Sequence, residues 1–308
     1  MSVSAPAGVS DIAAGLLDGT GFRAPSLIVT VWGDTIAPAG VAVWLGSLIR
    51  LAADFGLNER VVRTAVYRLQ KDGWLESEQS GRRSYYRLAP SGRHLTAAAD
   101  QRIYRTGLPD WDGDWLTLIA GPEIDPVRER LSRELVLQGF GVAAPGVFVR
   151  PDAALDDVRE ILADFGAADR IAVFRSREPG GAGGAAAREL VARAWDHDAI
   201  ATGYREFIAL FGPLEDRSAG LPPRDAFIVR TLLVHEFRRV TLRDPMLPAE
   251  LMTAGWPGVE ARELAGAIYR RVAAAAQSHA REVLETRSGR LPNPGPAYYH
   301  RFGGIAGD

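Results

Sequence analysis

One short stretch of the chain, residues 59–74, concentrates positive and polar side chains and reads ERVVRTAVYRLQKDGW. At about 100° per residue, its apolar residues Val62, Ala65, Val66 and Leu69 fall on one side of a helix. The other side and its flanks carry hydrogen-bond donors, namely Arg60, Arg63, Thr64, Tyr67, Arg68 and Lys71. Such a helix fits the DNA major groove, where arginine can bond guanine bidentately. We therefore predict that these six residues contact DNA while the apolar side docks on a small core.

A second group of candidate contacts follows in residues 74–90, which read WLESEQSGRRSYYRLAP. Two short extended runs about a Ser-Gly turn predict a β-hairpin. The side chains suited to phosphates or to the minor groove are Arg82, Arg83, Tyr85 and Arg87. Residues 58–94 hold eight Lys or Arg and four Asp or Glu, a net charge of +4, in a chain whose net charge is -2. The alternative is a solvated helix whose charges only keep the protein soluble.

The residues before this helix predict the elements that would position it. Residues 26–56 contain two apolar segments separated by a Pro/Gly turn, Gly56 ends the second one, and Asn58 is a good N-cap for the next helix. Three helices followed by a hairpin predict a winged helix-turn-helix domain over residues 25–105. Residues 1–24 are small, polar and rich in glycine, which predicts a flexible leader.

Composition and motifs argue against several classes of function. The chain has no cysteine, which excludes disulfides, thiolate metal sites and a cysteine nucleophile. No apolar run is long enough for a membrane span and no secretory signal is recognisable, so we expect a cytoplasmic protein. The glycine-rich residues 178–189 match neither phosphate-loop nor dinucleotide fingerprints and predict a linker. No nucleophile–base–acid set or metal-ligand spacing is evident, so we expect no enzyme activity, metal or cofactor.

The remaining two thirds of the chain alternate between strand and helix patterns and then become helical. Strands are predicted at 114–120, 146–151 and 170–176, with helices between them, which indicates a ferredoxin-like α/β domain over residues 110–178. Helical patterns at 186–211, 224–240 and 259–287 predict a helical C-terminal domain over residues 186–290, followed by a tail at 291–308.

Three blocks of the sequence resemble the PaaX family, repressors of bacterial phenylacetate degradation genes. The first is FGLNERVVRTAVYRLQKDGWLESEQSGRRSYYRLAPSGR followed by RIY, the second LSRELVLQGFGVAAPGVFVRP, and the third HEFRRVTLRDPMLPAELMTAGWPG. The resemblance covers roughly residues 24–288. It implies a homodimeric transcription factor that binds double-stranded operator DNA and is released by an acyl-CoA such as phenylacetyl-CoA.

The resemblance also bears on the middle and C-terminal regions. The family's middle domain is similar to ferredoxin-like proteins of CRISPR adaptation, some of which are nucleases with an Asp at the end of the first strand. Ala120 and Gly121 stand there in this chain, so we expect dimerisation instead. Arginines and aromatic groups near the C-terminus could form an effector pocket for CoA phosphates and an aryl group, with candidates Tyr204, His235, Arg238, Arg239, Arg243 and Trp256. The alternative, favoured for any single one of them, is structural pairing of buried charges.

The sequence thus predicts an α+β protein with a winged helix-turn-helix domain, a ferredoxin-like domain and a helical domain. The first functional hypothesis is a ligand-responsive repressor of an aromatic-acid catabolic operon. The second is a CoA-ester-binding module or enzyme that uses the winged helix to bind another protein. A protein-binding helix would expose apolar residues, whereas this helix exposes charged ones, so the sequence favours DNA.

Overall fold

The structure, a computed structural model, describes residues 6–121, 124–151, 154–177, 184–252 and 254–305. The chain divides into two compact units. The first unit comprises residues 1–106, 205–239 and 260–308, and the second comprises residues 107–204 and 240–259. Within the described residues, no helix has the length and apolar character that a membrane span requires.

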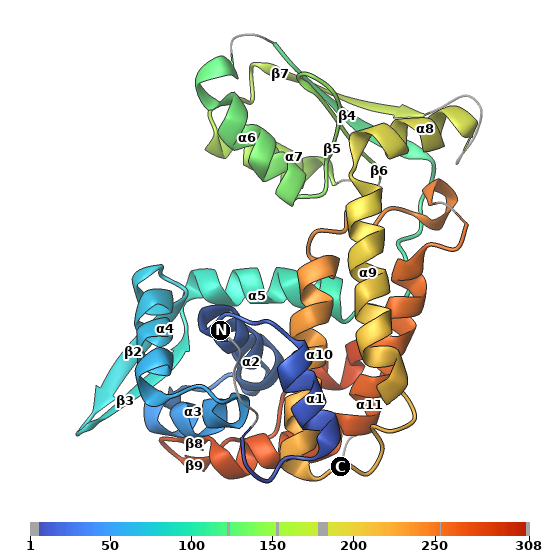
Figure 1. The fold of residues 1–308 in the computed structure, drawn as a ribbon. Helices are drawn as coiled ribbons and strands as arrows, with labels where there is room; N and C mark the ends of the chain where they lie inside the picture. The colour runs from blue at the N-terminus through green and yellow to red at the C-terminus, as the bar shows by residue number, and fades with distance from the viewer. Residues whose placement is uncertain (1–5, 122–123, 152–153, 178–183, 253, 306–308) are drawn as a thin grey trace. The chain divides into compact units, whose positions relative to one another are not determined.

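The N-terminal part of the first unit is built from helices and a small antiparallel sheet (Figure 1). Its helices are α1 (Asp11–Gly19), α2 (Ala24–Val31), the π-helical η1 (Trp32–Ile36), η2 (Ala37–Ala39), α3 (Leu45–Ala52), η3 (Ala53–Phe55), α4 (Glu59–Lys71) and α5 (Pro90–Ile103). Its strands are β1 (Val43–Trp44), β2 (Leu75–Ser80) and β3 (Arg83–Leu88), in the order β1-β3-β2. The predicted succession of helices and hairpin is therefore present.

Local sequence signals explain how α4 is delimited. Gly56 has a φ of 70°, which lets the chain turn after η3. Asn58 then caps α4, because its side-chain oxygen accepts a hydrogen bond of 3.0 Å from the backbone N–H of Val61. At the other end, Gly73 has a φ of 73° and turns the chain into β2.

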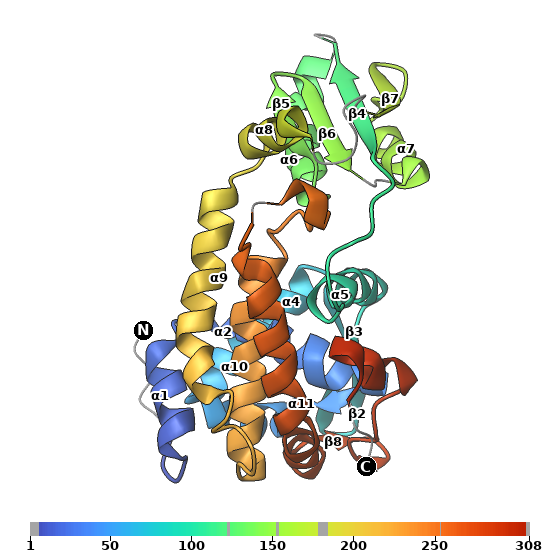
Figure 2. The same ribbon diagram turned by 90° about the vertical axis from the view of Figure 1, so that its right-hand side faces the viewer.

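The rest of the first unit comes from the C-terminal third of the chain. Its elements are the end of α9 (His197–Phe211), η5 (Gly212–Leu214), α10 (Pro223–Thr241), α11 (Pro257–Val283), β8 (Glu285–Thr286), β9 (Gly289–Arg290) and η7 (Pro296–Gly303). The parts of α9, α10 and α11 in this unit lie side by side (Figure 2). Phe207 on α9 packs against Phe237 on α10, with ring centroids 5.2 Å apart.

Three predictions of domain organisation were wrong where the structure describes the residues. The expected flexible leader contains helix α1, whose Leu16 and Leu17 are buried. The expected tail contains η7, whose Tyr298 and Arg301 are buried. The C-terminal helices form no compact unit of their own, because they are divided between the two units. In the first two cases tertiary packing orders a segment whose local composition gives little sign of it. Of the predicted linker, residues 178–183 lie outside the described residues.

The second unit contains a four-stranded antiparallel sheet with the βαββαβ order of a ferredoxin-like fold. Its elements are β4 (Asp114–Ala120), α6 (Asp125–Leu137), β5 (Gly141–Ala144), β6 (Val147–Pro151), α7 (Leu155–Asp164), β7 (Ile171–Arg177), α8 (Ala185–Ala194), the start of α9 and η6 (Ala249–Leu251). The strand order is β5-β6-β4-β7. Leu116 and Leu118 of β4 pack with α6 and α7 on one face, whereas Trp115 packs with α8 on the other. Strand β5 was missed because it is only four residues long.

Candidate nucleic-acid interface and a buried ion-pair network

Helix α4 divides into a buried and an exposed side, as its sequence pattern predicts. Val62, Ala65, Val66 and Leu69 are all buried in the first unit. The six candidate DNA contacts on the opposite side are all exposed: Arg60, Arg63, Thr64, Tyr67, Arg68 and Lys71. Together they form a surface of four cations, a hydroxyl and a phenol on one helix.

The contacts of this surface are weak enough to be exchanged for a ligand. Arg63 forms an exposed ion pair of 2.7 Å with Glu59, one turn earlier on α4. Exposed pairs of this kind contribute about 0.3–0.5 kcal/mol, so little free energy opposes their replacement by a base or phosphate. Tyr67 is 67% exposed, which is unusual for a large aromatic residue.

The hairpin β2–β3 carries three exposed arginines and one buried tyrosine. Arg82, Arg83 and Arg87 are exposed, but Tyr85 is only 6% exposed. We therefore remove Tyr85 from the candidate DNA contacts. It is buried because β3 is the central strand of the sheet, where Tyr85 pairs with Trp44 of β1. The pairing of β1 with β3 is a long-range contact that no local pattern predicts.

The arginines of the hairpin have acidic neighbours. Arg87 Nε lies 2.7 Å from an oxygen of Glu76 on the adjacent strand. Arg83 Nη1 donates a 3.0 Å hydrogen bond to Glu285 of β8, and its guanidinium lies 4.2 Å from the ring centroid of Trp44. Glu285 also pairs with Arg50 at the end of α3. The hairpin β8–β9 thus connects α3 to β3 through one carboxylate.

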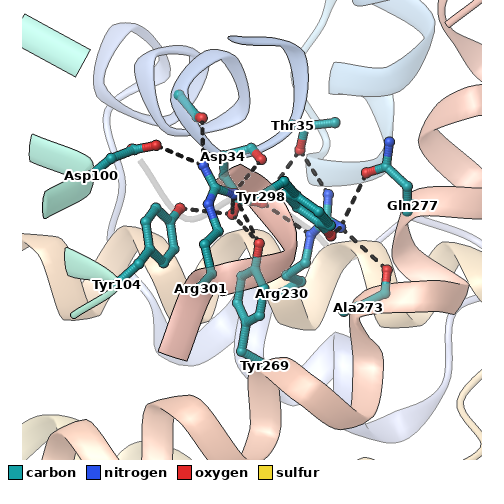
Figure 3. Close-up of polar contacts among 11 residues, drawn as sticks. Asp34, Thr35, Asp100, Tyr104, Arg230, Tyr269, Ala273, Gln277, Tyr298 and Arg301 are labelled. Atoms are coloured by element: carbon teal, nitrogen blue, oxygen red, sulfur yellow. Dashed lines mark hydrogen bonds and ion pairs between the residues drawn. The ribbon is translucent and has the colours of Figure 1, made fainter. Parts of the chain in front are cut away.

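A buried ion-pair network in the first unit joins segments from both ends of the chain (Figure 3). At its centre is the side chain of Asp34 in η1, which is 1% exposed. Asp34 Oδ1 accepts 2.8 Å hydrogen bonds from the hydroxyl groups of Tyr104 and Tyr269. Arg301 Nη1 lies 3.2 Å from the same oxygen, and Arg230 Nε lies 3.0 Å from Oδ2. Both arginine side chains are buried as well.

The two arginines reach further partners on opposite sides of Asp34. Arg301 Nη2 donates to Asp100 Oδ2 at 2.9 Å, and the guanidinium stacks 3.8 Å from the ring centroid of Tyr104. Arg230 donates to Thr35 at 2.9 Å and to the hydroxyl of Tyr298 at 3.1 Å. The network therefore holds two carboxylates and two guanidinium groups, and its formal charges balance.

Burial and charge together determine the ionisation of this network. Burial raises the pKa of Tyr104 and of Tyr269 well above the usual value, so both stay neutral and donate. Burial alone would lower the pKa of Arg230, but the charge of Asp34 and the neighbouring Tyr298 and Tyr269 together outweigh burial and raise that pKa above its ordinary value. Such an arrangement contains no activated nucleophile and serves to hold η1, α5, α10, α11 and η7 together.

Sequence reasoning missed this network, although two signals for it were present. Arg230 lies within the apolar stretch AFIVRTLLV, and Asp34 lies within VTVWGDTIA. A charged residue inside an apolar helix is seldom buried without a partner. The sequence does not indicate which residue the partner is, however, because Arg301 is 267 positions away from Asp34.

The six candidate effector residues do not come from one unit. Tyr204, Arg243 and Trp256 belong to the second unit, whereas His235, Arg238 and Arg239 belong to the first. The contacts within each unit are of the structural kind: the hydroxyl of Tyr204 donates to Asp244 at 2.7 Å, and Arg239 pairs with Glu236 at 2.7 Å.

His235 is a buried, neutral histidine. Burial, with the nearby charges of Arg238 and Arg239, lowers the pKa of His235 to about 3. Its Nδ1 lies 2.9 Å from the hydroxyl oxygen of Thr30, which itself donates to Ser26 O. The Thr30 hydroxyl has one proton, so Nδ1–H of the neutral ring donates to it. Among the described residues, no cluster of His, Asp or Glu is arranged to hold a metal ion.

Two cavities of the first unit border the buried network. One, of about 560 Å³, is lined by residues of α5 and of the C-terminal segment, including Asp100, Tyr104 and Arg301. The other, of about 260 Å³, is lined by the end of α11 and the segment that follows it. Both are large enough to admit part of a small molecule.

Three segments of the chain match family models in succession. The models are described as PaaX-like protein (residues 23–92), PaaX protein central Cas2-like domain (108–191) and PaaX-like protein C-terminal domain (195–282). The chain is 41% identical over 284 residues to the transcriptional repressor PaaX of Escherichia coli (strain K12). These aligned residues cover 91% of this chain and 90% of that protein. Among solved structures it is similar to the uncharacterized protein Rv0674 from Mycobacterium tuberculosis, with 26% identity, a TM-score of 0.51 and coverage of 82% of this chain and 98% of that one. Because its three consecutive segments and most of its length match in this way, the chain belongs to the PaaX-like protein family.

Proposed function

We propose that this protein is a DNA-binding transcriptional repressor whose residues 25–105 act as a winged helix-turn-helix. The observation that carries the proposal is helix α4, which buries its apolar side and exposes six donors on the other. The similarity to a transcriptional repressor supports the same function. The alternative of a protein-binding helix is not favoured, because charged residues dominate the exposed side of α4.

The proposed complex places α4 in the major groove and the hairpin β2–β3 on the neighbouring backbone. Arg60, Arg63 and Arg68 would bond base edges or phosphates from the exposed side of α4. Arg82, Arg83 and Arg87 would contact phosphates from the hairpin. Of the residues proposed from the sequence, Thr64, Tyr67 and Lys71 stay in the proposal and Tyr85 leaves it.

The protein would bind operator DNA as a homodimer through its second unit. Ile119 of β4 and Phe174 of β7 are 44% and 51% exposed, respectively. Both lie on the sheet face opposite to the core of Leu118 and Val173, as the strand register shows. A second copy would remove this apolar surface from water. Replacement of Phe174 by glutamate should then shift the mass measured by light scattering from dimer to monomer.

The effector would be an acyl-CoA of the phenylacetyl type, and the regulated genes an aromatic-acid catabolic operon, as membership of the family implies. The earlier candidates for this site remain Tyr204, His235, Arg238, Arg239, Arg243 and Trp256. The cavity of about 560 Å³ beside Tyr104 offers another place for an apolar acyl group, because its size lies within the range of small-molecule sites. The protein would act in the cytoplasm.

An equilibrium titration of the full-length protein with the DNA upstream of its own gene tests this proposal. It is measured at two salt concentrations, with and without phenylacetyl-CoA, against a shuffled DNA of equal length. Binding that is tighter for the upstream DNA, weaker at high salt and abolished by the ester is the expected result. Equal binding to both DNAs would contradict the repressor function, and binding that the ester leaves unchanged would contradict the effector.

A further inference from the structure

The turn that precedes α4 is held by two side chains from the C-terminal third of the chain. Asp54 lies in η3, shortly before the N-cap Asn58, and is 8% exposed. Its Oδ1 accepts a hydrogen bond of 2.6 Å from Nε of Arg224, at the start of α10. Its Oδ2 lies 2.7 Å from Nε2 of His279, near the end of α11. These three residues, here named the Asp54 cluster, join the turn to two long helices through one carboxylate.

The contact between Asp54 and His279 has a fixed direction. An ionised carboxylate only accepts hydrogen bonds, so Nε2 of His279 carries a proton and donates it. The ring of His279 packs on that of Phe227, with centroids 5.6 Å apart, which holds the imidazole in place. Phe227 in turn packs edge to face on Phe55 at 5.7 Å. The side chains of Asp54 and His279 are 11% and 13% exposed, so little water competes for the contact.

The turn between Asp54 and α4 is short and contains one flexible position. The N–H of Gly56 donates to Ala53 O at 2.9 Å, and the N–H of Leu57 donates to Ala52 O at 3.3 Å. Gly56 has a φ of 70°, a region in which glycine moves with less steric cost than other residues. The direction of α4 relative to α3 therefore depends on this turn, and an anchor beside Gly56 limits how far it can change.

The direction of α4 matters more for the recognition of bases than for the attraction to phosphates. A bidentate bond to a base edge requires close distances and aligned donors, so a small rotation of the helix breaks it. The attraction between a cation and the phosphate backbone falls off slowly with distance and needs no such alignment. A displaced α4 would therefore lose preference for particular sequences before it loses affinity for DNA in general.

We propose that the Asp54 cluster sets the direction of α4 for base recognition, with His279 and Arg224 as positioning residues that act through Asp54. The assignment rests on the proposed function, because it concerns the same recognition helix. Without the N–H of His279, Oδ2 of Asp54 loses its donor and the turn is held by Arg224 alone. The exposed side chains of α4 are all retained in that case, so specificity falls while general DNA binding persists.

Two substitutions of His279 test its role in DNA binding. His279→Leu removes the donor and keeps an apolar side chain against Phe227, whereas His279→Gln keeps an N–H donor of comparable reach. Each full-length protein is titrated with the DNA upstream of its own gene and with a shuffled DNA of equal length. His279→Leu should bind the upstream DNA about tenfold more weakly, or about 1.4 kcal/mol, which matches the loss of one base contact. Its affinity for the shuffled DNA should stay within about twofold of wild type, because the phosphate contacts remain.

The conservative variant and a control separate positioning from stability. His279→Gln should recover upstream affinity to within about threefold of wild type, because it restores the hydrogen bond. His300→Leu changes an exposed histidine outside the Asp54 cluster and should bind both DNAs like wild type. A purely structural role would lower the stability of His279→Leu but leave the ratio of the two DNA affinities unchanged in the folded protein. An unchanged ratio, or equal impairment of His279→Gln and His279→Leu, would overturn the proposal.

Amide hydrogen exchange of the free protein distinguishes failure of this proposal from failure of the repressor function. In His279→Leu, exchange should accelerate by about tenfold at residues 54–62 and stay unchanged in α5, because only the turn and the start of α4 lose their anchor. Unchanged exchange at residues 54–62 would overturn the proposal whatever the protein binds. Accelerated exchange there, in a protein whose wild type binds both DNAs equally, would support the anchor and contradict the repressor function alone.

Discussion

Glu285 Oε2 lies 3.0 Å from Arg83 Nη1, so a carboxylate near the C-terminus neutralises an arginine of the hairpin β2–β3. The same carboxylate pairs with Arg50 of α3. Two cations of the proposed DNA-binding region are thereby occupied by a segment 202 and 235 positions further along the chain. This contact opposes the use of Arg83 as a phosphate contact.

The substitution Glu285→Gln should therefore tighten DNA binding. Arg83 would be free to contact phosphate, which should steepen the dependence of log K on log salt by about one unit. Fluorescence anisotropy at several salt concentrations measures the change. Glu129→Gln removes the same charge from an exposed ion pair of the second unit and serves as the control. Equal affinity of wild type and Glu285→Gln would show that Arg83 does not reach DNA.

Arg63→Ala should weaken operator binding by about 1–3 kcal/mol and relax the base preference at one position of each half-site. The reason is the position of Arg63 on the exposed side of α4, where only the weak pair with Glu59 holds it. Titration against operators with single base changes gives the measurement. Arg133→Ala breaks an equivalent exposed pair, between Arg133 and Glu129 one turn apart on α6, and should leave affinity unchanged. A loss that is the same for every operator would assign Arg63 to phosphate instead.

Arg82→Ala should weaken binding to all DNA sequences alike. The exposed Arg82 lies at the turn of the hairpin, where a side chain reaches the backbone more easily than a base edge. The slope of log K against log salt should flatten by about one unit. A loss confined to particular operator bases would contradict a phosphate contact.

Asp34→Asn should destabilise the first unit by about 3–5 kcal/mol, because it leaves the buried Arg230 and Arg301 without their shared carboxylate. Urea unfolding followed by circular dichroism measures the loss. Asp216→Asn is the control, since the Asp216 side chain is 99% exposed. Similar stability of the two variants would mean that the network contributes little.

His235 should make the first unit less stable in acid. Its pKa is lowered to about 3 in the folded protein, chiefly by burial, from an ordinary value of 6.5. Between these values the unfolded chain binds a proton that the folded chain does not, so stability falls as pH decreases from about 6.5 toward 3. Urea unfolding across this range should show a shallower loss for His235→Gln than for wild type. His94→Gln changes an exposed histidine and should retain the wild-type slope.

Much of the first unit could be predicted because its signals are local. The apolar stripe of α4, the cap at Asn58 and the hairpin turn at Gly81 all involve residues within a few positions of one another. The helix period and the alternation of strands are short-range consequences of backbone geometry. The βαββαβ order of the second unit follows from the same signals, apart from the short strand β5.

The sequence by itself determined which surface of α4 faces outward, and it indicated the hairpin β2–β3 and the strands β4, β6 and β7, but not β1 or β5. Only the tertiary structure decided that residues 11–19 and 296–303 are packed elements, that Tyr85 is buried, and that Asp34 pairs with Arg230 and Arg301. The contact between Asp34 and Arg301, for example, joins residues that are 267 positions apart. The pairing of such distant groups depends on how helices pack in three dimensions, and no periodicity within a segment records it.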